Sequence, residues 1–335
     1  MSETNWTDVV GQKQLVDNLR GALKHNKISH AYLIEGEKLS GKKMIADIFA
    51  RALQCEAEEG EKPCNQCRSC KRALNRNHPD IIYVEHEKPN VISVDNIRQQ
   101  INGDIAIKPY SGERKIYIVD EAQKMNPQAQ NALLKTLEEP PEYAVILLLT
   151  TRAEAMLQTI LSRCVTLNTR PVHEELIKNF LMEKAKVPDY RAAICASFAR
   201  GNVGRAVELA SNEAFDNMKA SVIGAMKKIS EMQINQMAAE IKKITEEKFD
   251  VDDYLDLCFI WYRDVLLYKA CGVQGDKNHI IFKEDMMDIA DAAKRYSYDG
   301  IERIIHSIDR ARSRLKANVN FDLTMELMLL DMKAG

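Results

Sequence analysis

A glycine-rich loop constrains the fold of this chain more than any other feature of its sequence. Residues 36–43 fit the pattern G-x-x-x-x-G-K and read Gly-Glu-Lys-Leu-Ser-Gly-Lys-Lys. An apolar stretch at 31–35 precedes the loop and a helical pattern at 42–53 follows it, which is the strand–loop–helix context that a phosphate-binding loop (P-loop) requires. The sequence therefore predicts an α/β P-loop domain whose nucleotide-binding residues include Gly36, Gly41 and Lys42.

Two positions of the loop depart from a working nucleotide site. Lys43 stands where a P-loop has Ser or Thr, whose hydroxyl ligates Mg²⁺, and an ammonium group offers a metal no lone pair. Leu39 stands where tighter loops often have glycine, and its side chain is expected to hinder close approach of the backbone to phosphate. The sequence predicts a degenerate site and leaves open whether ATP and Mg²⁺ still bind.

An acidic pair ends a second apolar stretch. Residues 115–121 read Lys-Ile-Tyr-Ile-Val-Asp-Glu, the Walker B arrangement of a buried strand followed by carboxylates. In a site that hydrolyses ATP, Asp120 would help to hold Mg²⁺ and Glu121 would orient the attacking water. The alternative is that both carboxylates have only a structural role. In that case an ion pair between Lys43 and Asp120 would replace the metal ion that Asp120 would otherwise bind.

The order of patterns predicts an α/β architecture followed by helices. Candidate strands at 31–35, 81–84, 116–120, 145–150 and 165–167 alternate with helices, which favours a parallel sheet covered on both faces. One helix is predicted between Asn126, its N-cap, and the stop at Pro140. We expect an α/β domain over 1–168, a three-helix segment over 169–212, and an all-helical domain over 213–335.

Four clustered cysteines predict a metal site. Cys55, Cys64, Cys67 and Cys70 share the spacing of a closed tetrathiolate centre, so the module at 55–70 is expected to hold structural Zn²⁺. A redox C-x-x-C motif is the competing interpretation. The remaining cysteines are expected to be small core residues: Cys164, Cys195, Cys258 and Cys271.

The cysteine module also carries a basic helix face. Arg68, Lys71, Arg72 and Arg76 lie within it or just beyond it. This face is either a contact for nucleic acid or a partner, or simply a solvated helix surface.

Charge and hydropathy limit the classes of protein to consider. A net charge of −2 argues against a free-standing DNA-binding protein held by a broad basic surface. No apolar run approaches the roughly 18 residues that a membrane span needs, and the N-terminus lacks the pattern of a signal peptide. We expect a cytoplasmic protein without a membrane partner.

A lone arginine follows a predicted helix at 153–161. Ser162-Arg163-Cys164 leads into the strand at 165–167. An arginine at such a place is commonly a salt-bridge partner. The functional alternative is an arginine finger that stabilises the transferred phosphoryl group in a neighbouring subunit's site.

Taken together, these motifs resemble a known family. Thr7 to Gln12, His30 to Leu33, the cysteine module, His78-Pro79-Asp80, Asp120-Glu121-Ala122, Leu133 to Pro140 and Thr159 to Cys164 follow one another in order. This set resembles the clamp-loader subunits of bacterial DNA polymerase III, which are AAA+ proteins. The match is specific over residues 7–210 and looser in the C-terminal third.

The resemblance implies one of two kinds of subunit. The gamma/tau motor has an intact P-loop ending in Lys-Thr and a sensor arginine in its lid, whereas the stator subunit keeps the fold, the zinc module and Ser-Arg-Cys around a degenerate site. Here Lys43 replaces the threonine, Gly204 stands at the sensor position with Arg205 one place off, and the printed chain lacks the long extension of a tau subunit. We expect the stator; the alternative is an active motor ATPase that tolerates Lys43.

The resemblance also implies partners and roles. The segment at 169–212 would be the lid and 213–335 the collar of a heteropentamer with gamma/tau and delta subunits, which loads the sliding clamp onto primed DNA. Arg163 would be a finger acting in trans, and Thr150 or Thr151 would fall at the sensor-1 position. A zinc-dependent DNA-binding module acting alone is a third, weaker hypothesis, because the net charge opposes it.

Overall fold

The chain forms two compact units. The computed structural model describes residues 4–272 and 279–335. One unit contains Met1–Ile177 and Gly201–Arg205, and the other contains Lys178–Arg200 and Ala206–Gly335. The finer boundaries predicted at 168 and 212 remain predictions.

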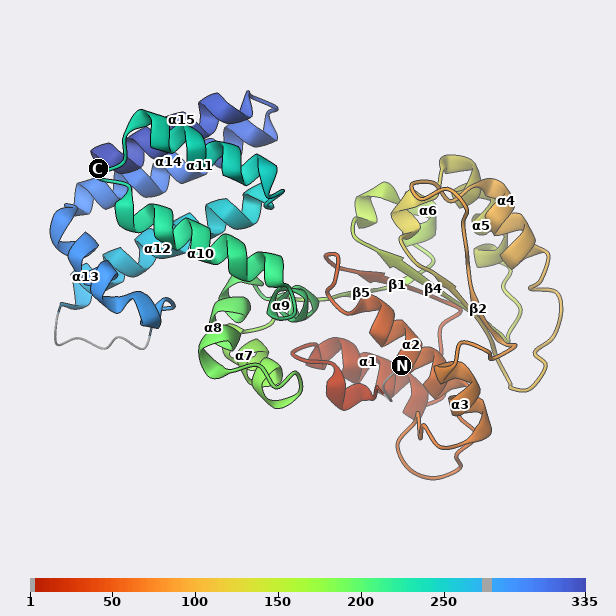
Figure 1. The fold of residues 1–335 in the computed structure, drawn as a ribbon. Helices are drawn as coiled ribbons and strands as arrows, with labels where there is room; N and C mark the ends of the chain where they lie inside the picture. Colours follow the sequence, from red (N-terminus) through yellow and green to blue (C-terminus); the bar gives the residue numbers. More distant parts are fainter. Residues whose placement is uncertain (1–3, 273–278) are drawn as a thin grey trace. The chain divides into compact units, whose positions relative to one another are not determined.

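The first unit is built on a parallel five-stranded sheet (Figure 1). The strands run in the order β2-β3-β4-β1-β5, and every pair is parallel. Their bounds agree with the predicted ones to within one residue at each end: β1 (Ala31–Glu35), β2 (Ile81–Tyr83), β3 (Lys115–Val119), β4 (Ala144–Thr150) and β5 (Val165–Asn168). The predicted α/β P-loop fold is confirmed.

Both faces of this sheet are buried, which explains the continuous apolar strands. Tyr32 and Ile34 of β1 pack into one core with α1 and α2, whereas Ala31 and Leu33 pack into a second core with α5 on the opposite face. Figure 1 shows the two sets of helices on the two sides of the sheet. The helices of this unit are α1 (Lys13–Lys24), α2 (Lys42–Leu53), α3 (Arg68–Leu74), α4 (Val94–Ile97), α5 (Pro127–Glu138) and α6 (Gln158–Leu161).

Two predicted helices in this unit had different outcomes. The side chain of Asn126 caps α5 by accepting a hydrogen bond from the amide of Ala129 at 2.8 Å, as predicted. The helix predicted over 153–161 is wrong as a single element. A 3₁₀ turn at Ala153–Ala155 and α6 are separated by Met156 and Leu157, which are extended and keep the two turns apart.

The second unit consists of helices, in keeping with the predicted all-helical C-terminal part. Its elements, with two that run across the boundary between the units, are α7 (Glu174–Glu183), α8 (Asp189–Phe198), α9 (Val203–Ala210), α10 (Glu213–Lys228), α11 (Ile234–Glu246), α12 (Val251–Cys271), α13 (Met286–Arg295), α14 (Tyr298–Lys316) and α15 (Phe321–Ala334). Helix α12 is central, because it packs against α10, α13 and α14 and buries Tyr254, Trp261 and Tyr262 almost completely. None of the described helices is long and apolar enough to cross a membrane.

The scattered cysteines behave as predicted with one exception. Cys195 and Cys258 are buried and Cys164 is partly buried, but Cys271 is exposed. The prediction of a core position for Cys271 is wrong because it is the last residue of α12 and lies beyond the packed part of that helix.

A buried carboxylate ties three segments of the second unit together. Asp256 on α12 is 4% exposed and accepts hydrogen bonds from Arg200, which follows α8, and from Arg312 on α14, the latter at 2.5 Å. Because a buried carboxylate left without partners is very unfavourable, these arginines stabilise the packing of the three segments.

Asp264 on α12 is a second buried carboxylate, and it has fewer partners. Its Oδ2 accepts hydrogen bonds from the amides of Ile281 and Phe282 at 2.8 and 2.9 Å, while Oδ1 accepts none from the described residues. Burial raises the pKa of Asp264 to about 6, against the lowering effects of those amides and of Arg263. The carboxyl is therefore destabilising when ionised.

The raised pKa gives a prediction of pH-dependent stability. Because the folded-state pKa lies above the ordinary value of 3.8, this group adds stability below about pH 4 that is lost as the pH rises through about 6. Replacing Asp264 with Asn should raise the free energy of unfolding of the second unit at about pH 8 by roughly 3 kcal/mol and flatten its dependence on pH. Denaturant unfolding followed through Trp261 in a Trp6→Phe background measures this. The matched change Asp291→Asn, at an exposed carboxylate of α13, should have no such effect.

Candidate functional site

The candidate nucleotide site lies at the carboxyl edge of the sheet. Because the strands are parallel, the loops that follow β1, β3 and β4 meet at one edge, where ligands bind in open α/β sheets. A cavity of about 530 Å³ opens there. It is lined by Lys38, Leu39, Ser40, Gly41, Lys42, Lys43, Asp120, Glu121, Gln123, Leu149, Thr150 and Thr151.

The backbone of the P-loop has positive φ angles at two positions, and one of them is strained. Gly41 is the N-cap of α2 and has a φ of +88°, a conformation that suits glycine. Leu39 also has a positive φ, +66°, which costs a residue with a side chain about 1 kcal/mol. The loop therefore keeps its turn without the second glycine of tighter P-loops.

The invariant lysine of the motif is bonded to its own loop. Lys42 is 8% exposed, and its Nζ donates to the carbonyl oxygens of Gly36 and Glu37 at 2.7 and 2.6 Å. Burial lowers the pKa of Lys42, while the nearby carboxylates Asp120 and Glu121 oppose that effect. Two of the three donors of this ammonium group are thus bonded to the backbone of the loop.

Gly36 is fixed by a neighbour outside the loop. A Cβ at Gly36 would lie 1.8 Å from Oγ1 of Thr169, whose hydroxyl donates to Oγ of Ser40 at 3.2 Å. Thr169 directly follows β5 and fills the space beside the first turn of the P-loop. The requirement for glycine at this position therefore has a packing reason in addition to any contact with phosphate.

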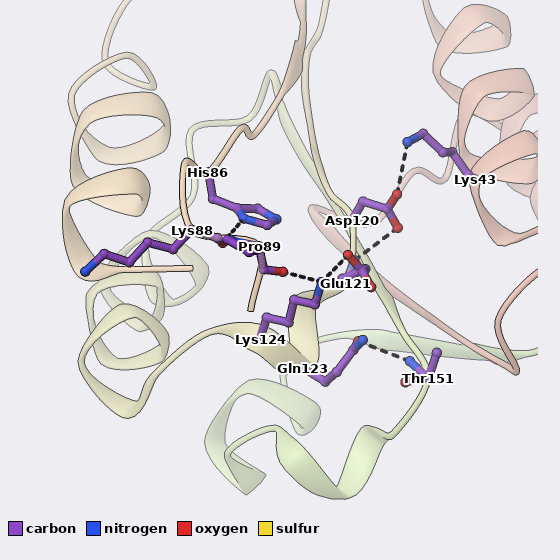
Figure 2. A network of polar contacts seen from close by, with 9 residues as sticks. All are labelled: Lys43, His86, Lys88, Pro89, Asp120, Glu121, Gln123, Lys124 and Thr151. Carbon is purple, nitrogen blue, oxygen red and sulfur yellow. Dashed lines mark hydrogen bonds and ion pairs between the residues drawn. The ribbon is translucent and has the colours of Figure 1, made fainter. Parts of the chain in front are cut away.

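Lysines pair with both Walker B carboxylates (Figure 2). Nζ of Lys43 lies 3.1 Å from Oδ2 of Asp120, which confirms the predicted ion pair. Nζ of Lys124 lies 2.5 Å from Oε2 of Glu121 and also donates to the carbonyl oxygen of Pro89 at 2.6 Å. The Lys43–Asp120 pair is about half exposed and Glu121 of the other pair is 47% exposed, so both pairs add little to stability. They do place an ammonium group beside each of the two carboxylates.

The two threonines at the end of β4, Thr150 within the strand and Thr151 directly after it, have different surroundings. The hydroxyl of Thr150 is buried and is shared with the backbone of Arg152, through its oxygen at 3.0 Å and its nitrogen at 3.1 Å. Thr151 lines the cavity and has its amide bonded to Oε1 of Gln123 at 3.2 Å (Figure 2). Of the two, Thr151 has the more available hydroxyl.

A glycine from the start of α9 closes against the P-loop. A Cβ at Gly204 would lie 2.3 Å from the carbonyl oxygen of Leu39, and Nδ2 of Asn202 donates to the carbonyl of Lys38 at 2.7 Å. The backbone of the loop therefore occupies the space into which a side chain at residue 204 would project. No side chain larger than hydrogen fits there without a shift.

The four clustered cysteines converge on one point. Sγ atoms of Cys55, Cys64, Cys67 and Cys70 all lie within 4.8 Å of one another. Tetrahedral zinc with bonds of about 2.3 Å would place the sulfurs about 3.8 Å apart, so the cluster can hold a metal ion after a small contraction. Burial raises the pKa of Cys64, but amide donors from Cys67 and Gln66 outweigh it and lower the pKa to about 6, which favours the thiolate that a metal requires.

Arg163 is partly exposed and held by its own chain. Nη2 of Arg163 lies 2.9 Å from Oε1 of Glu138, at the end of α5, and Nη1 donates to the carbonyl of Thr159 at 2.9 Å. Its side chain retains 36% of its exposure. The guanidinium is thus anchored at the surface, away from the cavity residues of the same chain.

Sheet order, P-loop and acidic pair define the class of protein. A five-stranded parallel sheet with a P-loop after β1, a Walker B pair after β3 and a following helical part is the organisation of an AAA+ nucleotide-binding domain. Residues 11–173 match the family described as DNA polymerase III, delta subunit. The delta' subunit of DNA polymerase III from Bacillus subtilis is 30% identical over 97% of both chains. The chain therefore belongs to the clamp-loader family of DNA polymerase III subunits, in its delta-prime branch.

A tau subunit and a gamma subunit-related protein of DNA polymerase III are also similar to this chain. The tau subunit of DNA polymerase III from Bacillus subtilis is 30% identical over 85% of this chain, which spans about half (54%) of that relative's length. A solved gamma subunit-related protein of DNA polymerase III from Thermotoga maritima is 23% identical and covers 95% of this chain and 99% of its own, with a TM-score of 0.43.

Two features of the site were not predicted from the sequence. Lys124 was missed, although its position three residues after Glu121 permits an (i, i+3) pair within one helical turn. The contact of Gly204 with Leu39 joins residues that are far apart in the sequence, and no local signal points to it.

Proposed function

We propose that this chain is the stator of the clamp loader: a delta-prime subunit whose own nucleotide site is degenerate and which does not hydrolyse ATP. The observation that carries the proposal is the ion pair of Lys43 with Asp120, because an ammonium group stands where Mg²⁺ would bridge protein and phosphates. The pair of Lys124 with Glu121 adds to it, since it engages the residue that would orient the attacking water.

The catalytic contribution of the stator is made in trans. Arg163 is partly exposed at the surface and does not line the cavity of its own chain, which suits an arginine that completes a neighbouring gamma/tau subunit's ATP site. In this role the ion pair with Glu138 positions the guanidinium at the surface. On assembly, Arg163 would release Glu138 and contact the ATP phosphates bound to the neighbouring subunit.

The helical C-terminal part has a surface suited to a collar. Leu323, Leu327 and Leu330 of α15 are 52%, 40% and 42% exposed and recur at the spacing of one helix face. An apolar stripe of this kind supports packing against other subunits of a heteropentamer with gamma/tau and delta. The partners acted upon are the sliding clamp and primed DNA within the complex.

The cysteine cluster completes the proposed assignment as a structural Zn²⁺ centre. Cys55, Cys64, Cys67 and Cys70 would supply all four ligands, which leaves no open position for catalysis. The metal would therefore fix the local chain and take no part in ATP chemistry.

Restoring the hydroxyl at residue 43 tests whether the site is inert. Neither the wild-type chain nor a Lys43→Thr variant is expected to turn over Mg-ATP, because Lys42 still donates to its own loop, Lys124 still pairs with Glu121 and no sensor arginine fits at residue 204. Steady-state phosphate release and a titration of Mg-ATP binding measure this. A Lys43→Thr/Lys124→Ala double variant shows whether freeing Glu121 as well is sufficient.

The second candidate function is an active motor ATPase. The cavity of about 530 Å³ and the retention of Lys42, Asp120 and Glu121 favour it. Turnover by the wild-type chain that is abolished by Glu121→Gln would establish this function and overturn the stator proposal.

A further inference from the structure

The cysteine module carries a cavity that the proposed function does not use. A space of about 380 Å³ lies along α3, and its lining consists of cationic and amide side chains: Gln66, Arg68, Lys71, Arg72, Asn75 and Asn77. Four of these residues lie on one side of α3, because they are spaced three or four residues apart along the helix and its C-cap: Arg68, Lys71, Arg72 and Asn75. The cavity is therefore built by one helical face that concentrates positive charge.

The three cations of this face have no counterion within the described part of the chain. Arg68, Lys71 and Arg72 form neither an ion pair nor a side-chain hydrogen bond with residues 4–272 or 279–335. Arg76, one turn further on, differs: its Nη2 lies 3.6 Å from Oδ2 of Asp47, and its guanidinium lies 4.4 Å from the centre of the Tyr83 ring. Arg76, which does not line the cavity, therefore has an acidic partner, whereas the three cations that line the cavity have none among the described residues.

The positive charge of the cysteine module is unevenly distributed along the sequence. Four thiolates and one Zn²⁺ sum to a charge of −2. All five cationic residues of the module lie in the segment 62–77, which contains no Asp or Glu, whereas the module's four glutamates lie in the segment 56–61. Positive charge is therefore concentrated on the side of the module formed by α3. Like charges gathered without counterions repel one another, and an anionic ligand relieves that repulsion.

The kind of anion follows from the donors. Arginine, lysine and side-chain amides are the groups that contact phosphate oxygens in protein–nucleic acid interfaces. The lining contains no aromatic side chain on which an unpaired base could stack. We propose that this cavity is a contact site for the phosphodiester backbone of duplex nucleic acid. The inference goes beyond the proposed function, which assigns the cysteine module no nucleic-acid contact of its own.

The experiment measures binding of a fluorescent duplex oligonucleotide to the full zinc-loaded chain by anisotropy over a range of salt. Each phosphate contact adds about 0.9 to the slope of log K against log salt, so an Arg68→Gln/Arg72→Gln variant should reduce the slope by about 2 and weaken binding by roughly a hundredfold near 50 mM salt. The control Lys24→Gln/Lys27→Gln removes the same charge from exposed positions in the same unit and should leave both quantities unchanged. Equal zinc content in all three proteins verifies that the module is intact.

A second readout requires no substitution. Duplex should protect Lys71 of the wild-type chain from acetylation, measured by mass spectrometry, and Lys24 should stay reactive. The proposal is overturned if the wild-type chain does not bind the duplex at low salt, or if the two double variants bind it equally and Lys71 is not protected. Binding of poly-glutamate, but not of duplex, in a manner sensitive to Arg68 and Arg72 would also overturn it, because the surface would then take an acidic polypeptide.

Discussion

Replacing Arg163 with alanine is expected to lower ATP hydrolysis by the assembled clamp loader while leaving the assembly intact. An arginine finger stabilises charge on the transferred phosphoryl group and typically contributes about 10³- to 10⁵-fold to the rate at the site it completes. Loss of the finger should therefore nearly silence one neighbouring site and reduce total hydrolysis by that site's share. The rate is measured at saturating clamp and primed DNA, and assembly is measured by size-exclusion chromatography.

Glu138 provides a control for the purely structural alternative. If Arg163 acts only through its ion pair with Glu138, then Glu138→Gln should reduce hydrolysis as much as Arg163→Ala does. If Arg163 acts on a neighbour's ATP, Glu138→Gln should leave the rate nearly unchanged and Arg163→Lys should recover little of it, because a lysine lacks the planar fork. An unchanged rate for Arg163→Ala at saturating substrates would refute the assignment.

Loss of the metal is expected to unfold the cysteine module. Structural zinc contributes an apparent ~10–16 kcal/mol in small zinc-dependent peptides, and the segment 55–70 has little regular structure apart from the start of α3 to hold it together. Cys67→Ser, or chelation of the wild-type chain, should abolish bound zinc and raise hydrogen exchange across the module. The exposed residue Cys271 supplies the matched control, since Cys271→Ser makes the same chemical change away from the cluster.

Trp6 reports this transition from outside the module. Its Nε1 donates to the carbonyl of Lys62 at 2.8 Å and its ring is 4% exposed, so unfolding of the module should expose it and shift its fluorescence to longer wavelength. A zinc-free protein whose Trp6 fluorescence and hydrogen exchange match those of the purified wild-type chain would show that the cysteines hold no structural metal.

Local sequence determined the frame of the protein. The strand at 31–35, the glycine-rich loop and helix 42–53 are coded by neighbouring residues, because apolar runs, glycines and helix formers act over short spans. The cysteine spacing is local in the same sense. The strands and the helix at 42–53 were therefore predicted to within one residue at each end, whereas the helix over 153–161 failed because its pattern gave no sign of the extended residues Met156 and Leu157.

The tertiary structure determined the contacts and the burial of individual side chains within this fold. The ion pair of Lys43 with Asp120 was predictable because the P-loop motif and the Walker B motif meet at one sheet edge in any fold of this class. The crowding of Gly36 by Thr169, the contact of Gly204 with Leu39 and the raised pKa of Asp264 were not predictable. Each of these features depends on how closely separate segments pack or on how deeply a group is buried. Neither the distance nor the burial can be read from residue spacing along the chain. The sequence thus determined that a nucleotide-binding fold and a four-cysteine cluster form, and packing alone decided how the site is filled and which cations of α3 are left unpaired around an open cavity.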